Sequence, residues 1–163
     1  MSQIVEDHGS EFNLPGGVEY VRAFSVPDRV AFIRDIPNRI TRLRMRNAAL
    51  SWSLSLSIAS LKVLDDYVDG IIDGLLAQDK RIGEAIDREL VEDIVAYVGE
   101  VVVRSANGRW EEDASPSSRG PLLMYESSPG GEVIFRGLDI FDQVLVCLEE
   151  GGALSNWYQH EIN

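Results

Sequence analysis

The pattern of apolar and polar positions changes its period within one short segment, LSWSLSLSIASL, at residues 50–61. Its first part alternates apolar residues with serines, and this period of two predicts a strand over about 49–55 with Trp52 on the apolar face. The apolar residues then recur every three or four positions, which predicts a helix over about 58–77. Ser57 lies at the change of period, where a serine hydroxyl can cap the new helix.

Later elements follow from the same patterns and from their turn residues. Two more apolar stripes predict helices, one over about 84–105 and one over LDIFDQVLVCLEE with Asp139 as its N-cap. The short segments RWEEDA, PLLMYES and GEVIFR are divided by turn residues, which predicts a strand meander with Gly130-Gly131 as a hairpin turn. The segment SNWYQHEI is expected to close the chain as an edge strand.

The N-terminal part of the chain is less regular. Residues 1–17 are polar and are expected to form a tail, residues 18–24 alternate as a strand, and residues 28–35 predict a short helix that Pro37 ends. Together these elements predict a single α+β domain over 18–163. In this domain three to four helices pack on an antiparallel sheet of about four to six short strands.

Two motifs support this fold by resemblance. The segment GEVVVRSANGRWEE (99–112) and the S-x-x-S-L-x-x-x-D arrangement at 57–65 resemble a loose group of uncharacterised bacterial proteins that is frequent in actinobacteria. The group shares a helix ending in Gly-Glu, a Gly-Arg-Trp turn, a short strand meander, a helix and a terminal segment containing tyrosine. The resemblance covers about 50–158, with Ala-Asn-Gly at 106–108 in place of the more usual double glycine. It implies an α+β fold and no particular activity.

Composition and charge narrow the classes of partner. The chain has 163 residues, 27 acidic against 15 basic side chains and a formal net charge of −12, which disfavours nucleic acid and anionic membranes as partners. A single cysteine excludes an internal disulfide, and no apolar run approaches the roughly 20 residues of a membrane span. The N-terminus is polar and acidic without the apolar stretch of a signal peptide, so a cytoplasmic location is expected.

The basic residues are concentrated in one segment. Residues 29–46 contain six arginines and a single acidic residue, although the chain as a whole is acidic. One interpretation is that these arginines lie over an acidic surface of the same molecule or of a second copy. The other is an anion-binding site formed by Arg39, Arg42, Arg44 and Arg46.

The predicted helix that follows Ser57 carries a DDxxD spacing. Asp66, Asp69 and Asp73 project from one helical face, and with Asp65 they could supply oxygen ligands for Mg²⁺. The alternative function is therefore a Mg-dependent hydrolase or phosphate-handling enzyme that uses this face. The helical phase also places the aspartates opposite the apolar stripe. A solvated acidic face, which could meet the arginine segment, is the interpretation we favour.

The remaining chemistry-bearing residues do not form a catalytic set. The only histidines, His8 and His160, lie in the terminal segments, no GxSxG serine motif is present, and Cys147 falls on the inner stripe of its helix. We therefore predict a non-enzymatic acidic protein-binding domain without a cofactor, similar in kind to small inhibitor or immunity proteins.

The expected contact residues lie in two places. The aromatic pair Trp157 and Tyr158 on the predicted edge strand could contact a protein partner or a second copy, because aromatic residues concentrate at interface centres. Asp69 and Asp73 are the acidic residues expected to contact a basic partner.

Overall fold

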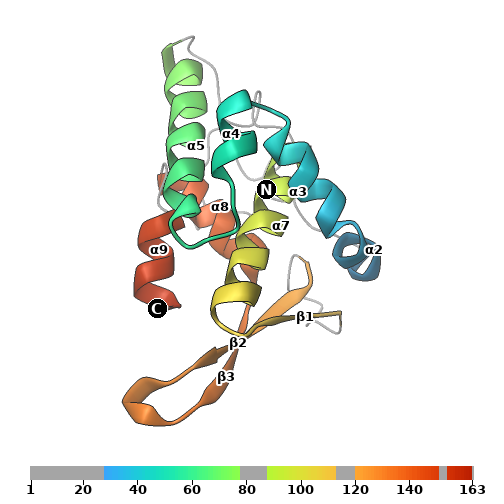
Figure 1. Cartoon of the computed structure of the whole chain (residues 1–163), viewed down its shortest axis with the longest axis vertical. Coiled ribbons are helices and arrows are strands. Elements are labelled where there is room, and N and C mark those ends of the chain that lie inside the picture. The colour runs from blue at the N-terminus through green and yellow to red at the C-terminus, as the bar shows by residue number, and fades with distance from the viewer. Residues whose placement is uncertain (1–27, 78–87, 113–119, 151–153, 163) are drawn as a thin grey trace, which may run out of the picture.

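A computed structural model describes residues 28–77, 88–112, 120–150 and 154–162. The described part has α+β architecture, as the sequence predicted, with seven helices and one three-stranded antiparallel sheet (Figure 1). The helices are α2 (Arg29–Arg34), α3 (Ile36–Arg44), α4 (Ala48–Ser53), α5 (Ser60–Ala77), α7 (Arg88–Ser105), α8 (Ile140–Glu150) and α9 (Leu154–Glu161). The strands are β1 (Arg109–Glu111), β2 (Leu122–Ser127) and β3 (Ile134–Leu138), and a 3₁₀ turn, η2 (Pro129–Gly131), joins the last two.

Within the described residues, the numbers of helices and strands differ from those predicted. The sheet has three strands where four to six were expected, and there are seven helices where three to four were expected. The strand predicted at 18–24 and the tail at 1–17 lie outside the described residues, so the proposed domain boundary stays a prediction. No helix of the described part is long and apolar enough to cross a membrane.

Helix α7 is the centre of the core. Its residues from Leu90 to Val98 are all buried, so the helix is enclosed around its whole circumference over more than two turns. Helix α3, helix α8 and strand β2 pack directly against it, and helix α5 packs against helix α9. Because every side of α7 is covered, the other helices are arranged around it rather than on one face of the sheet (Figure 1).

The segment with alternating serines folds as helix α4, so the predicted strand at 49–55 was wrong. Leu50 and Leu54 are buried, while Trp52 between them is 89 % exposed. The physical reason is that residues four apart share a helical face, so a period-two pattern of leucines also fits a helix when the middle position points outward.

The start of helix α5 agrees with the prediction from the change of period. The Ser57 hydroxyl accepts a hydrogen bond from the backbone N–H of Ser60 at 3.2 Å, as a capping serine does. Ahead of it, Leu56 has a positive φ of 64° and donates its N–H to the Tyr97 hydroxyl at 2.8 Å. The same hydroxyl bonds the Ser60 hydroxyl at 2.6 Å. A buried tyrosine of α7 therefore fixes the loop between α4 and α5.

Two further predictions about boundaries were wrong. The terminal segment forms helix α9 and not an edge strand, because Leu154, Trp157 and Tyr158 recur at helical spacing and face the core. Pro37 does not end a helix but lies in the first turn of α3, where proline costs no hydrogen bond.

Other boundaries agree with the prediction. The Asp139 carboxylate accepts the backbone N–H of Asp142 at 3.3 Å and caps α8. Gly130 and Gly131 form the turn between β2 and β3, with φ values of 65° and 89° that favour glycine. Strand β2 pairs with both of its neighbours, with Trp110 opposite Leu123 on one side and Tyr125 opposite Arg136 on the other.

A close contact between α7 and the sheet makes Gly99 sensitive to substitution. A Cβ atom added at Gly99 would lie 2.2 Å from two ring atoms of Trp110, whereas one added at Gly70 on α5 would meet no atom within 4 Å. We expect Gly99→Ala to lower the free energy of unfolding by about 1–3 kcal/mol through overpacking. Gly70→Ala should raise it by up to about 1 kcal/mol through helix propensity. Urea denaturation of both variants measures the difference, and equal shifts would contradict the packing of Trp110 on Gly99.

Candidate functional site

The arginine segment is paired with carboxylates of α7. Arg42 makes a two-pronged contact with Asp93, with Nη2 to Oδ1 at 2.7 Å and Nε to Oδ2 at 2.9 Å. Arg39 places Nη1 2.9 Å from Glu92, and Arg46 lies 3.6 Å from Glu89. These ion pairs join α3 and the residues just after it to α7 within one molecule, as one of the two interpretations of the segment expected.

Asp93 is the most deeply buried charge of this network. Its side chain is fully enclosed, and burial raises the pKa of the Asp93 carboxyl while Arg42, Arg39 and Arg46 oppose that rise. The hydrogen bond to Asp93 raises the pKa of the Arg42 guanidinium, so Arg42 stays charged. A carboxylate inside the core is tolerated because bidentate hydrogen bonds satisfy both of its oxygens.

The four arginines proposed for anion binding are therefore engaged within the chain. Three of them face carboxylates, and Arg44 donates from Nε to the backbone carbonyl of Leu54 at 2.8 Å. An external anion would have to compete with these contacts. A cavity of about 540 Å³ lies beside the network and is lined by acidic and basic groups in equal number, so its charge favours neither sign of ligand. Its charged lining residues are Asp28, Arg34, Asp35, Arg39, Arg88 and Glu92.

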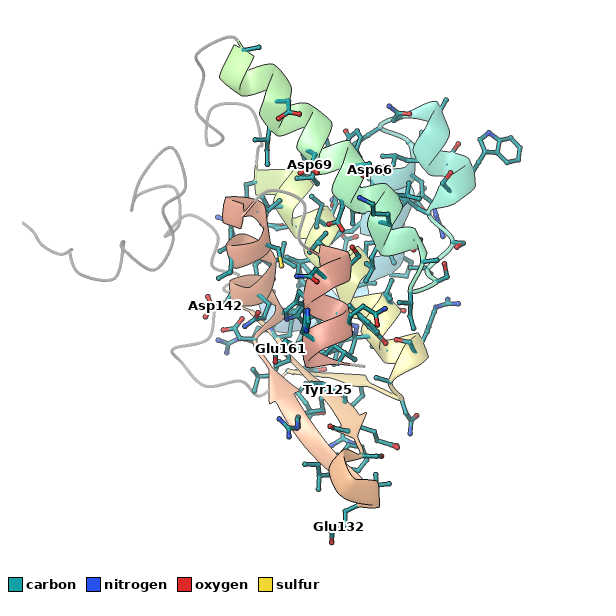
Figure 2. All side chains as sticks on the ribbon, turned by 90° about the vertical axis from the view of Figure 1, so that its left-hand side faces the viewer. Asp66, Asp69, Tyr125, Glu132, Asp142 and Glu161 are labelled. Atoms are coloured by element: carbon teal, nitrogen blue, oxygen red, sulfur yellow. The ribbon has the colours of Figure 1, made fainter. Side chains whose placement is uncertain are left out.

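The four aspartates of α5 do not share one face, and the expectation that all of them lie outside was wrong for Asp65. Asp65 is fully buried and caps the N-terminus of α9: it accepts the backbone N–H of Leu154 at 2.8 Å and both the N–H and the hydroxyl of Ser155, at 3.0 and 2.6 Å. Asp66 is exposed and pairs with Lys62 at 3.0 Å. Figure 2 labels Asp66 and Asp69 on α5.

The magnesium hypothesis gains no support from this arrangement. Asp69 is half-buried and Asp73 is exposed further along the helix, while the oxygens of Asp65 are occupied by hydrogen bonds from α9. In the part of the chain that the structure describes, no three His, Cys, Asp or Glu side chains come together in a way that could hold a metal ion. The metal site stays a prediction.

The predicted aromatic contact residues lie in the core. Trp157 and Tyr158 are both buried, their rings meet edge to face, and the Tyr158 hydroxyl hydrogen-bonds that of Ser105 at the end of α7. Helical spacing, and not an edge strand, explains their burial. They offer a partner little surface in this conformation.

Six large apolar side chains of the described residues are exposed, and three of them are consecutive on the hairpin of β2 and β3, while Val30, Met45 and Trp52 are separated along α2 to α4. Val133, Ile134 and Phe135 are 61, 39 and 55 % exposed and lie between η2 and the first residues of β3. The hairpin of β2 and β3 extends beyond the helices (Figure 1). Figure 2 shows Glu132 at the far end of this hairpin, away from the helices. We call Val133, Ile134 and Phe135 the hairpin patch. Sequence reasoning missed it, although three consecutive apolar residues in a strand signal apolar groups on both faces.

Comparisons with known proteins found no relative for this chain. No family model matches it, and neither does any curated protein or solved structure. The function must therefore follow from the contacts of the chain itself.

The buried cap predicts that the aspartates of α5 differ sharply in their effect on stability. Asp65→Asn places an amide donor among three donors, so we expect the free energy of unfolding to fall by about 1–3 kcal/mol. Asp66→Asn removes only an exposed ion pair and should cost less than about 0.5 kcal/mol. Thermal and urea unfolding measure both. A larger loss from Asp66→Asn than from Asp65→Asn would contradict the placement of α9 on α5.

The ion pair between α3 and α7 predicts a strong energetic coupling. In a double-mutant cycle of Arg42→Met and Asp93→Asn, we expect a coupling energy of about 1.5–3 kcal/mol, because bidentate hydrogen bonds between charged groups are strong. The exposed pair of Lys62 and Asp66 serves as the control and should show a much smaller coupling, because solvent screens it. Urea denaturation supplies the four free energies of each cycle. A coupling no larger than the control would show that Arg42 does not stabilise α3 on α7.

Proposed function

We propose that this chain is a non-enzymatic protein-binding domain and that its contact surface is the hairpin patch. The observation that carries the proposal is the exposure of Val133, Ile134 and Phe135 on a hairpin that extends from the body. Contiguous exposed apolar residues are uncommon on monomeric proteins and mark sites that another surface covers.

The geometry of β3 supports this assignment. Successive side chains of a strand point to opposite faces, so Ile134 lies on one face of the hairpin and Phe135 on the other. Both are exposed, which means that neither face of the sheet is covered at this end. An ordinary two-layer sheet has at least one face packed on the core, so the uncovered end is suited to a partner.

The other candidate surfaces support binding less well. The aromatic pair of α9 is buried, and the arginine segment is occupied by carboxylates of α7. The proposal therefore keeps the protein-binding role expected from the sequence. It moves the contact surface from α5 and α9 to the hairpin.

A capture experiment tests the role of the hairpin. The tagged chain is incubated with extract of its source cells, and retained proteins, including untagged copies of the chain, are quantified by mass spectrometry. We expect the double variant Ile134→Ser/Phe135→Ser to lose specific partners at least tenfold, since buried apolar anchors dominate binding. Trp52→Ser is the matched control, because Trp52 is an exposed apolar residue on α4, outside the hairpin. Capture that survives the hairpin variant, or falls equally with the control, would overturn the proposal.

A further inference from the structure

We infer that the partner of the hairpin is a second copy of this chain, joined by antiparallel pairing of β3 with β3 about a two-fold axis at Ile134. The inference rests on the proposed function, because it names the partner of the same surface. It joins two three-stranded sheets into one sheet of six strands.

The first argument is the open edge of β3. The strand order is β1-β2-β3, so within the described residues β3 pairs on one side only. An edge strand presents backbone N–H and C=O groups to any strand that comes alongside, and monomeric proteins usually protect such an edge with lysine, proline or a bulge. The strand reads IFRGL: it contains neither lysine nor proline, and Arg136 is its one charged residue. The backbone remains extended at Glu132, with φ −89° and ψ 134°, so the available edge begins before Ile134.

The second argument is that the sequence of this edge is complementary to itself. The order Glu132, Val133, Ile134, Phe135, Arg136 carries opposite charges at equal distances from Ile134. An antiparallel pair centred on Ile134 therefore places Glu132 opposite Arg136 of the second copy, and Arg136 opposite its Glu132. It also places each Val133 opposite a Phe135, and the two Ile134 side chains opposite each other. Opposite charges and apolar pairs in directly facing positions both stabilise a sheet.

Neighbouring registers lack this match. A pair centred on Arg136 would place two arginines opposite each other, and a pair centred on Phe135 would place Arg136 opposite Ile134. Like charges in facing positions are destabilising. The charge pattern of the edge thus favours the register centred on Ile134 over these two.

The third argument is that a two-fold dimer uses the β3 edge of both copies and covers exposed residues on both faces of the hairpin. A two-fold axis brings the same surface of both copies together, and the pairing leaves no open β3 edge for further copies. The exposed side chains on both faces of the hairpin meet their counterparts at once, because the two hairpins lie side by side in one sheet.

The net charge limits the strength of the association but does not prevent it. Two copies with a charge of −12 repel each other, and this repulsion is screened beyond about 8 Å at physiological ionic strength. The paired edges are short, because β3 has 5 residues, and small interfaces are typical of weak or transient association. We therefore expect a dissociation constant on the order of micromolar to tens of micromolar.

Charge exchange tests the register directly. Sedimentation velocity of the whole chain over about 1 µM to 1 mM measures the monomer–dimer equilibrium of the wild type and of Glu132→Arg and Arg136→Glu separately. Each single variant places like charges opposite each other at two positions, so we expect its dissociation constant to rise about tenfold or more. An equimolar mixture of the two variants pairs arginine with glutamate at both positions and should dimerise like the wild type. This recovery also shows that both variants are folded.

The outcomes separate the inference from the proposed function. Dimerisation of the wild type and of the mixture, with loss in each single variant, supports the inference. A wild type that stays monomeric at 1 mM overturns it, and hairpin-dependent capture of another protein would then leave the proposed function standing. A dimer that neither single variant weakens overturns the β3 edge as its site. Failure of the mixture to dimerise overturns the register.

Discussion

The rest of the structure depends on the burial of helix α7, which is enclosed on all sides and contains a buried carboxylate. Helix α7 presents apolar residues around its whole circumference, and Asp93 lies among them without solvent exposure. A carboxylate in that position is costly unless charged donors satisfy it, which requires a basic helix alongside. Helix α3 meets this need with Arg39 and Arg42, which accounts for two of the six arginines concentrated in this part of an acidic chain. Three of the four arginines that suggested an anion site are thereby engaged with carboxylates of α7, and the anion site itself stays a prediction.

The same requirement for satisfied polar groups fixes the C-terminal helix. The first N–H groups of α9 have no partners within the helix, and Asp65 of α5 accepts two of them across 89 and 90 residues of sequence. The tyrosine hydroxyl of α7 acts in the same way on the loop before α5. Single side chains on the two longest helices therefore position the shorter elements around them. The DDxxD spacing includes one such residue, which is why its resemblance to a metal motif carries little information about chemistry.

The elements predicted correctly from the sequence are those whose pattern of apolar residues fits a helix or a turn but not a strand. The stripes of α5, α7 and α8 and the turn at Gly130 were read correctly, because long helical repeats and glycine turns have few alternatives. The errors at α4 and α9 come from short segments that fit more than one period. At α4, for example, the spacing of Leu50 and Leu54 fits both the period of two of a strand and the spacing of four of a helix. The burial of Asp65 could not be predicted, since it depends on a helix that begins 89 residues later. The run of three apolar residues at 133–135 was visible in the sequence, but their exposure was not, because it depends on where the helices end.

The hairpin patch consists of three consecutive exposed apolar residues, whereas the other exposed large apolar side chains of the described residues, Val30, Met45 and Trp52, are separated along the chain. Around α7 the buried carboxylate has guanidinium partners and the leucines have a core, whereas Phe135 is 55 % exposed, with the guanidinium of Arg109 5.8 Å from the centre of its ring. Exposed apolar edges favour indiscriminate pairing, and alternating charges are one way to restrict it. Glu132 and Arg136 flank the apolar residues. Their order stabilises the antiparallel register centred on Ile134 and destabilises the one centred on Arg136. A surface that bound any apolar partner would not require opposite charges at equal distances from Ile134. The charges therefore bear more directly on the identity of the partner than the apolar residues do.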